Sequence, residues 1–268
     1  MLINSRENPK IKLYKKLSTG RKNRDEHGLF TVEGARICVD AAKEAANGNI
    51  KIHSVFYTGQ AIEKYSEFLD TKLLFECAED NRIYEVTEEI AGKMSEEGTS
   101  QGIFLIAYKL DKKFSCENID GDGKYLIADN LQDPGNLGTL LRTADAVGVN
   151  GVVLTGNCVD LYNPKVVRST MGSMPRLNIF IENDFEKVMS IFGRKGIKVA
   201  AAVVSGGKSV SEYDFSKSCA VVIGNEGRGI PQQHIEMCND KITIKMHGHI
   251  ESLNAAAAGT IILWEMFR

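Results

Sequence analysis

Five short apolar runs in the second half of the chain constrain its fold most strongly. They are Lys124–Asp129, Gly151–Thr155, Lys198–Val204, Cys219–Gly224 and Lys241–Met246. Each run has the length of one strand, and runs without regular polar alternation are typical of parallel strands buried on both faces. The second half is therefore predicted to be an α/β domain with a mostly parallel sheet.

The segments around these runs have apolar residues at helical spacing, and the first half of the chain alternates in a similar way. Helices are expected at Val32–Ala46, Ala61–Leu69, Thr139–Gly148, Asp184–Gly193 and Ser252–Phe267, and further strands at Lys51–Thr58 and Gly102–Tyr108. A polar segment with two glycines, Lys109–Lys124, lies between the halves. We therefore expect an N-terminal domain over residues 1–112, a linker over 113–122 and a second domain over 123–268.

The composition excludes two classes of protein. Hydrophobic residues make up 43% of the 268 residues and charged residues 25%, which is the balance of a globular protein and not of a disordered one. No apolar run approaches the roughly 18–20 residues of a membrane span. Residues 1–16 lack the apolar centre of a secretory signal, so a cytoplasmic protein is expected.

The cysteines and histidines do not form a metal-binding pattern. No two of the six cysteines have the Cys-x-x-Cys spacing, so reduced thiols that pack as small apolar residues are expected. His247, His249 and Glu251 occupy alternate positions, which on a strand would share one face. No further ligand cluster accompanies them, and no metal is expected.

Charge is concentrated at the N-terminus, although the net charge of the chain is only −2. Residues 1–24 contain eight basic residues and one acidic residue. Such a segment can neutralise several nucleic-acid phosphates. A solvated helix face with spare lysines explains the same pattern, and both interpretations stay open at this point.

Three glycine-bearing segments resemble ion or phosphate loops but do not fit them. Ser205–Ser209 resembles the end of a Walker A loop, but Ala202 stands where the upstream glycine is required. Gly224–Gly229 has the wrong glycine spacing for a dinucleotide fold. Asp120–Lys124 is followed by Tyr125, where a calcium loop requires glycine. A nucleotide-phosphate enzyme is therefore not supported.

Three other loops follow predicted strands at their carboxyl ends, where α/β sheets usually bind ligands. In the first, Asn130–Gly148, a tight turn at Asp133–Asn136 precedes Arg142, which lies six positions after Asn136. Side chains near this helix start are close enough to converge on one ligand. In isolation, an ordinary turn with Asn136 as N-cap and Arg142 as a surface cation is the better explanation of these residues.

The other two loops are rich in small residues. Ile223–Ile230 contains three glycines within six residues, which expose backbone groups, and one carboxylate, Glu226. In Ile244–Glu265, Ser252 and Asn254 open an alanine-rich helix that another element can approach closely. Each loop alone is a weak signal. Together, in this order and at these strand ends, the three loops are a strong one.

The three loops resemble the three signature motifs of the SpoU (TrmH-like) RNA 2′-O-ribose methyltransferases of the SPOUT class. The resemblance covers residues 120–268, including Val166–Ile179. Phe30–Arg36 and Thr99–Ala107 are similar to the substrate-binding domain that precedes many rRNA members. Lys245 departs from the pattern, because many members have proline there. That loop acts through its backbone in the family, so the expected effect is small.

The resemblance implies a fold and partners that composition and periodicity do not indicate. The second domain would contain a deep trefoil knot, with S-adenosylmethionine bent into it, after a smaller α/β RNA-binding domain. Threaded chains are rare exceptions among protein folds. The partners would be RNA, rRNA in particular, and a second copy packed through knot-region helices, without membrane or metal.

Motif positions also imply the site residues. Arg142 would hold a phosphate and stabilise the developing alkoxide, while Asn136 and Glu226 would orient the ribose or brace Arg142. Ser252 and Asn254 would place the phosphate, the ribose or their partner loops. The cofactor is expected on Thr155, Gly156, Ile223, Gly224, Asn225, Gly227, Ile244, Met246 and Leu253. RNA is expected on Lys10, Lys15, Lys16, Arg21 and Arg24.

The resulting hypothesis is an S-adenosylmethionine-dependent rRNA 2′-O-methyltransferase. One alternative keeps the chemistry and takes tRNA as substrate, but an N-terminal RNA-binding domain of this size is more usual in rRNA members. Another alternative is a non-catalytic RNA-binding assembly factor. The complete set of motif residues argues against that alternative, since a degenerate member would have lost some of them.

Overall fold

The computed structural model describes residues 2–96 and 98–268 and divides into two compact units. The first unit comprises Met1–Leu110 and Asp160–Arg176, and the second comprises Asp111–Val159 and Leu177–Arg268. Residues 160–176 follow a strand of the second unit in sequence but cluster with the first. The first unit is therefore built from two separate stretches of chain.

The second unit contains a seven-stranded sheet in the order β10-β12-β9-β11-β6-β7-β8. Its strands are β6 (Lys124–Asp129), β7 (Gly151–Thr155), β8 (Ile179–Ile181), β9 (Lys198–Ala202), β10 (Lys208–Ser209), β11 (Cys219–Ile223) and β12 (Asp240–Thr243). Every neighbouring pair in this sheet is parallel. The mostly parallel sheet expected from the apolar runs is therefore confirmed.

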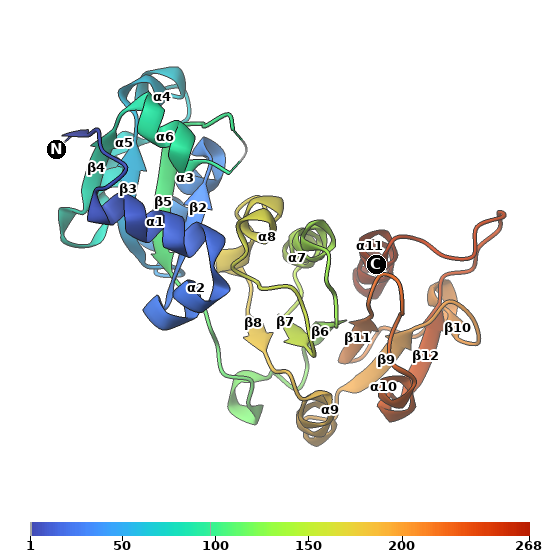
Figure 1. The fold of residues 1–268 in the computed structure, drawn as a ribbon. Coiled ribbons are helices and arrows are strands. Elements are labelled where there is room, and N and C mark those ends of the chain that lie inside the picture. The colour runs from blue at the N-terminus through green and yellow to red at the C-terminus, as the bar shows by residue number, and fades with distance from the viewer. Residues whose placement is uncertain (1, 97) are drawn as a thin grey trace. The chain divides into compact units, whose positions relative to one another are not determined.

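Helices cover both faces of this sheet, with α7 and α11 on one side and α9 and α10 on the other (Figure 1). The helices are α7 (Pro134–Val147), α9 (Phe185–Arg194), α10 (Gln232–Met237) and α11 (Ala255–Phe267), with short 3₁₀ turns at Cys116–Asn118 and Val210–Glu212. Phe185 and Phe192 of α9 pack in one core with Ile127 and Val222 of the sheet. On the opposite face, a Cβ at Gly259 would lie 2.3 Å from Leu140 Cδ2, so this glycine permits the close packing of α11 on α7.

The strand order places β6 beside β11. From β6 the chain continues to β7 and β8 on one side, and it later returns to β9 and β11 on the other side. The carboxyl ends of the strands at such a reversal are where open α/β sheets bind ligands. Asn225 Nδ2, after β11, donates a hydrogen bond of 2.9 Å to Asn130 O, after β6, and so joins the two loops.

The first unit has a five-stranded mixed sheet in the order β1-β4-β3-β5-β2. Its strands are β1 (Leu2–Ile3), β2 (Leu29–Glu33), β3 (Ile52–Tyr57), β4 (Ile83–Val86) and β5 (Ile103–Tyr108). Its helices are α1 (Pro9–Thr19), α2 (Arg21–His27), α3 (Ala35–Ala46), α4 (Gly59–Lys64), α5 (Thr71–Glu76), α6 (Glu88–Met94) and α8 (Pro164–Ser169), with 3₁₀ turns at Glu79–Asn81 and Met174–Arg176. Strand β5 is antiparallel to β2 and β3, and the other pairs are parallel.

Residues 160–176 are integrated into the first unit by packing and by an ion pair. The Tyr162 ring packs against Phe30 of β2 with 4.8 Å between the ring centroids and a tilt of 43°, and both rings are buried. Asp160 accepts two hydrogen bonds from the Arg24 guanidinium of α2, at 2.7 and 2.9 Å. The two residues are 136 positions apart in sequence, and their contact is nearly shielded from solvent. Removing one partner of such a buried ion pair destabilises a protein by several kcal/mol, because the other charge is left buried and unpaired.

Two helix boundaries in the first unit differ from the sequence-based expectation. The helix expected from Val32 begins at Ala35, because Val32 pairs with β5 as part of β2 and Gly34, with φ 112°, ends that strand. The helix expected over Ala61–Leu69 is replaced by α4, which begins at Gly59. The Thr58 side chain accepts the Ala61 N–H at 3.2 Å and fixes this earlier start.

Within residues 2–96 and 98–268, no helix has both the length and the apolar character needed to cross a membrane. All six cysteines are free thiols.

Candidate active site

The start of α7 fixes the first of the site residues. Asp133 is the N-cap, and its carboxylate accepts the Asn136 N–H at 2.8 Å. Pro134 occupies the first helical turn, where its missing N–H and fixed φ are favourable. Asn136 is consequently held in the first turn, 9% exposed, beside the carboxyl end of β6.

Three side chains, one from each predicted motif, form a continuous hydrogen-bonded group. Asn136 Nδ2 donates to Glu226 Oε1 at 3.1 Å, and Asn254 Nδ2 donates to Asn136 Oδ1 at 3.0 Å. We call Asn136, Glu226 and Asn254 the motif cluster. Its members lie 90 and 118 positions apart in sequence. The structure therefore brings together three of the five residues that the motifs assign to catalysis.

Glu226 is held by backbone donors as well as by Asn136. Its carboxylate accepts the N–H groups of Asp133 and Gln132 at 2.8 and 3.2 Å. Burial on its own raises the pKa of Glu226, but the hydrogen bonds from Asn136 and the backbone outweigh it and lower the pKa below its ordinary value of 4.5. The ionised carboxylate is thus the form that this site stabilises.

Glu226→Gln is expected to destabilise the protein at neutral pH but not at acid pH. The pKa of Glu226 is lower in the folded state than in the unfolded state, so its ionised carboxylate stabilises the fold at pH values above the unfolded-state pKa. This stabilisation is lost as the pH falls through the folded-state pKa. Because Glu226 is exposed, the expected loss at pH 7 is below about 1 kcal/mol. Denaturant unfolding at pH 7 and below about pH 4 measures it, with the exposed Glu212→Gln as control. An equal loss at both pH values would contradict the assignment.

The loop after β11 folds back on itself and requires glycine at its first position. Asn225 exchanges two backbone hydrogen bonds with Gly229, at 3.1 and 2.9 Å, and its Oδ1 accepts the N–H groups of Gly227 and Arg228. A Cβ at Gly224 would lie 2.5 Å from the backbone carbon of Gly229. A side chain at position 224 would therefore open the loop.

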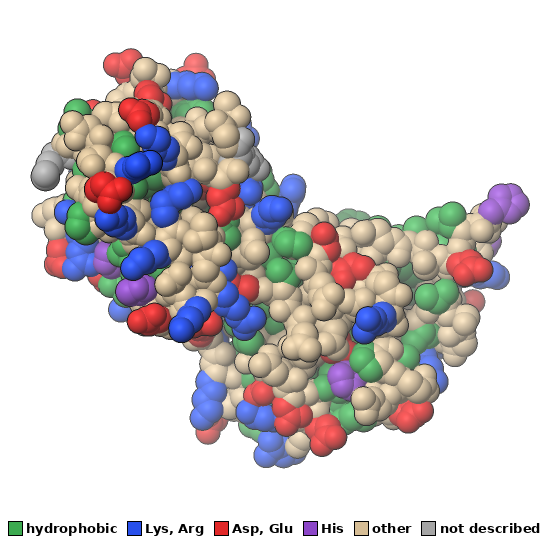
Figure 2. All heavy atoms as spheres, viewed as in Figure 1, with side chains coloured by type: hydrophobic (Ala, Val, Ile, Leu, Met, Phe, Trp, Pro, Cys, Tyr) green, Lys and Arg blue, Asp and Glu red, His purple; other side chains and the backbone are tan. Residues whose placement is uncertain are grey.

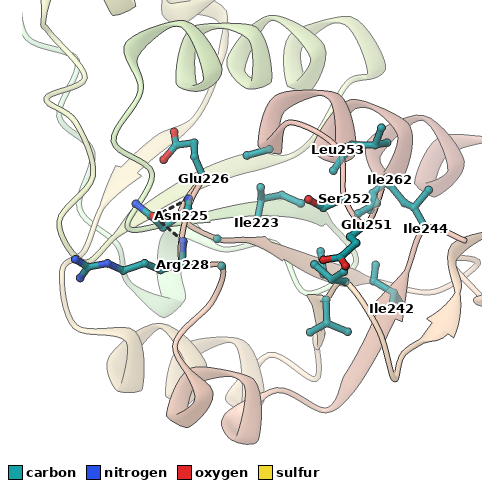
Figure 3. Close-up of a pocket in the computed structure, with 18 of the residues that line it drawn as sticks. Ile223, Asn225, Glu226, Arg228, Ile242, Ile244, Glu251, Ser252, Leu253 and Ile262 are labelled. Atoms are coloured by element: carbon teal, nitrogen blue, oxygen red, sulfur yellow. Dashed lines mark hydrogen bonds between the residues drawn. The ribbon is translucent and has the colours of Figure 1, made fainter. Parts of the chain in front are cut away.

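This loop lines a pocket of about 310 Å³ at the carboxyl edge of the sheet (Figure 3). Nine residues assigned from the sequence line the pocket: Ile223, Gly224, Asn225, Glu226, Gly227, Ile244, Met246, Ser252 and Leu253. Sequence reasoning missed other lining residues, among them Ala202 at the end of β9, Val203 and Val204 just after it, Ile242 of β12, and Ala258 and Ile262 of α11. Ala202–Val204 are the last residues of the predicted strand Lys198–Val204, so their position at its carboxyl end was the available signal.

Arg142 and Thr155 are placed outside this pocket. Arg142 lies on α7, is exposed, and has no hydrogen bond or ion pair within residues 2–96 and 98–268. It is not bonded to the motif cluster. Thr155 is fully buried at the end of β7, and its Oγ1 has no hydrogen-bond partner among the described residues. Gly156, with φ 66°, packs against the side chain of Asn130.

A hydrogen-bonded pair formed by Asp129 and the partly exposed His234 had no signal in the sequence. Asp129, at the end of β6, is fully buried, and its Oδ2 lies 2.7 Å from His234 Nδ1. The imidazole stacks on Phe185 at 4.1 Å. Burial raises the pKa of Asp129, while hydrogen bonds from His234 and Asn130 act in the opposite direction. Because Asn130 also accepts from Asn225, this pair supports the loop that lines the pocket.

The basic residues that the sequence assigns to RNA lie on helices α1 and α2. Figure 2 shows Lys and Arg side chains gathered over α1 and α2. Lys16 and Arg21 are exposed, and Lys10 and Lys15 are partly exposed, because α1 buries its opposite face through Ile11, Tyr14 and Leu17. Arg24 differs: it is 3% exposed and bound to Asp160 and to Leu17 O. It is a structural residue in this conformation and does not face solvent with the others.

No group of three His, Cys, Asp or Glu side chains suited to a metal ion occurs in the part of the chain that the structure describes. The pocket instead combines backbone groups with aliphatic side chains, which suits an organic ligand. A parallel sheet with such a pocket at its strand reversal has the features of an α/β cofactor-binding enzyme.

Comparisons with known proteins define the family. Residues 123–264 match the SpoU rRNA Methylase family, and residues 8–105 match the MRM3-like substrate binding domain. The chain belongs to the SpoU rRNA methylase family.

Relatives match over nearly the whole chain. The 23S rRNA (guanosine(2553)-2′-O)-methyltransferase RlmP of Bacillus subtilis is 29% identical, over 98% of each chain. An uncharacterised tRNA/rRNA methyltransferase of Synechocystis is 31% identical, over 99% of this chain and 93% of that one. The AdoMet-bound rRNA methyltransferase from Sinorhizobium meliloti has a TM-score of 0.84 and 28% identity, covering 99% of this chain and 97% of that one. AviRb from Streptomyces viridochromogenes, in complex with AdoMet, has a TM-score of 0.81 and 25% identity over 97% of each chain.

Proposed function

We propose that the protein transfers the methyl group of S-adenosylmethionine to a ribose 2′-hydroxyl of rRNA. The observation that supports this most directly is the motif cluster, which joins all three motif loops beside one pocket. The Bacillus subtilis relative is a 23S rRNA 2′-O-methyltransferase, and the Sinorhizobium meliloti structure contains AdoMet. Both likenesses extend over both units.

The pocket fits the proposed cofactor. The aliphatic side chains of Ile223, Ile242, Ile244, Leu253 and Ile262 provide apolar surface for the flat adenine ring. Backbone groups of the loop after β11 and of residues 244–253 can bind its polar edges. When bound, S-adenosylmethionine supplies a methyl group that its positively charged sulfur has already activated. The protein therefore has to position the acceptor and stabilise charge on it.

The acceptor oxygen needs help because a sugar hydroxyl is a poor nucleophile. Arg142 is unsuited to removing its proton, since a guanidinium stays protonated in proteins. We assign Arg142 instead to binding the neighbouring phosphate and stabilising the negative charge that develops on the 2′-oxygen. The proton would leave through phosphate or water. The guanidinium is exposed and has no bonded partner in the part of the chain that the structure describes, so it is free to make these contacts with RNA.

The motif cluster would act mainly by fixing the loops. Glu226 accepts three hydrogen bonds from the first motif, and Asn254 both caps α11 and donates to Asn136. These contacts fix the positions of the three motif loops relative to one another at the carboxyl ends of the strands. Ser252 lines the pocket and would contact the substrate or its partner loops.

Two finer features belong to the same proposal. We assign the second unit a trefoil knot, supported by family membership and by contacts between loops up to 118 positions apart. We also assign a homodimer, supported by the exposed face of α11, where Ile261 is 38% and Trp264 64% exposed. A second copy would cover these apolar side chains. Light scattering of the purified chain measures its mass.

Transfer of labelled methyl groups tests the function. The protein is incubated with labelled S-adenosylmethionine and total RNA from a strain that lacks the gene. Label is expected in rRNA, as a 2′-O-methylated nucleotide. RNA from the parent strain is the control, and it should accept little label because its site is already modified. Label confined to tRNA, or no label in any RNA, would contradict the proposal.

A further inference from the structure

Two carboxylates line the pocket, and they differ in how they are bonded. Glu226 accepts hydrogen bonds from Gln132, Asp133 and Asn136. Glu251 has no hydrogen bond or ion pair within the described parts of the chain, residues 2–96 and 98–268. The Glu226 carboxylate is therefore already hydrogen-bonded within the protein, whereas the Glu251 carboxylate is available to bind a ligand.

The side-chain directions support the same distinction. In Figure 3, the Glu226 and Arg228 side chains extend away from the aliphatic part of the pocket. The carboxylate of Glu251 instead points among the aliphatic lining residues, toward the side of Ile242 in that view. Among the charged lining residues labelled there, Glu251 is the one turned toward the apolar part.

A carboxylate next to apolar surface favours a cationic ligand. When a ligand fills the pocket and displaces water, an unpaired carboxylate loses hydration, and a cation on the ligand compensates for that loss. Lys245, His247 and His249 are the nearest basic residues in sequence, and no ion pair joins any of them to Glu251 in the described structure. The proposed cofactor has two positive groups, a sulfonium and an α-ammonium.

We propose that Glu251 binds the α-ammonium group of the methionine part of S-adenosylmethionine, an inference that rests on the proposed function. The ammonium group offers three N–H donors, which suits charge-assisted hydrogen bonds to a carboxylate. The sulfonium is the poorer partner. Its methyl group is electrophilic, and a carboxylate oxygen in line with the S–CH3 bond would compete with the ribose oxygen for the methyl carbon, forming a methyl ester and releasing S-adenosylhomocysteine.

A calorimetric binding experiment with three ligands shows which part of the cofactor Glu251 contacts. S-adenosylmethionine has both positive groups, S-adenosylhomocysteine keeps only the ammonium, and 5′-methylthioadenosine has neither but keeps adenine and ribose. Glu251→Gln removes the charge and keeps the shape. We expect it to weaken binding of the first two ligands about tenfold and to leave the third unchanged.

The other outcomes each overturn the inference. A loss for S-adenosylmethionine alone would place Glu251 at the sulfonium, and an equal loss for all three ligands would place it at the nucleoside. Unchanged affinities would remove Glu251 from the cofactor site. The matched control is Glu212→Gln, an exposed carboxylate of the same unit that does not line the pocket. If the unaltered protein bound no S-adenosylmethionine, the proposed function itself would fail, which is a separate result.

Discussion

Arg142→Ala is expected to reduce the rate of methyl transfer on bound RNA by about 10²–10³-fold and to leave cofactor affinity unchanged. The expected size is that of removing one preorganised donor to a developing oxyanion. Arg142 is exposed, does not line the pocket and has no bonded partner in the described structure. Its loss should therefore affect the reaction and not the fold. Single-turnover rates at saturating RNA and cofactor measure this effect directly.

Two further variants make this result specific. Arg142→Lys keeps the charge but loses the planar fork that binds phosphate through two hydrogen bonds, so an intermediate rate is expected. Arg194→Ala, an exposed arginine at the end of α9, should retain the full rate. A near-normal rate for Arg142→Ala would show that another group stabilises the 2′-oxygen.

Reversing three charges on the first unit is expected to weaken RNA binding by about 10–100-fold at moderate salt. The variant is Lys15→Glu, Lys16→Glu and Arg21→Glu together, on α1 and α2. If each cation neutralises one phosphate, the slope of log affinity against log salt should fall by about two to three. S-adenosylmethionine affinity should not change, because none of the three residues lines the pocket.

A matched triple variant controls for net charge. Lys43→Glu, Lys64→Glu and Lys72→Glu alter three exposed lysines on α3, α4 and α5 of the same unit. Filter binding across a salt series measures and compares the RNA affinities of the two triple variants. If both triples lose the same affinity, the effect is one of total charge, and if neither loses affinity, the RNA-binding surface lies elsewhere.

The parts of the fold that were predicted well are those with a strong local pattern. The bounds of β6 and β7 match the expected runs, because strands buried on both faces are apolar from end to end. Strand β4, with only Val86 buried, has no such pattern and was not predicted. Helix α11 begins at Ala255, three residues later than expected, because the Asn254 side chain accepts the N–H groups of Ala256 and Ala257 as its cap.

For the site residues too, the sequence indicated some features and only the structure showed the others. Asn136, Glu226 and Asn254 were found through motif positions, and the structure adds the hydrogen bonds that join them. The spacing of six between Asn136 and Arg142 corresponds to about 240° around a helix, so the two side chains point in different directions. Asn136 is accordingly buried and Arg142 exposed.

Contacts between distant segments gave no sequence signal. The bond between Asp129 and His234 joins residues 105 positions apart, and neither position shows a local pattern that indicates the other. The buried contact of Arg24 with Asp160 is of the same kind, and it is the reason that a residue in a basic segment is not on the basic surface. Such pairs become visible only once the topology is known.

The packing of residues 160–176 on β2 limits how this enzyme can be divided or recombined. A chimera made by exchanging residues 1–110 with those of a relative would pair a foreign β2 with the resident Tyr162, and a foreign α2 with Asp160. A fragment starting at Asp111 would expose Val166, Val167 and Met174, which are buried in the intact chain. Grafting a new RNA specificity onto this catalytic unit therefore requires transplanting both stretches together.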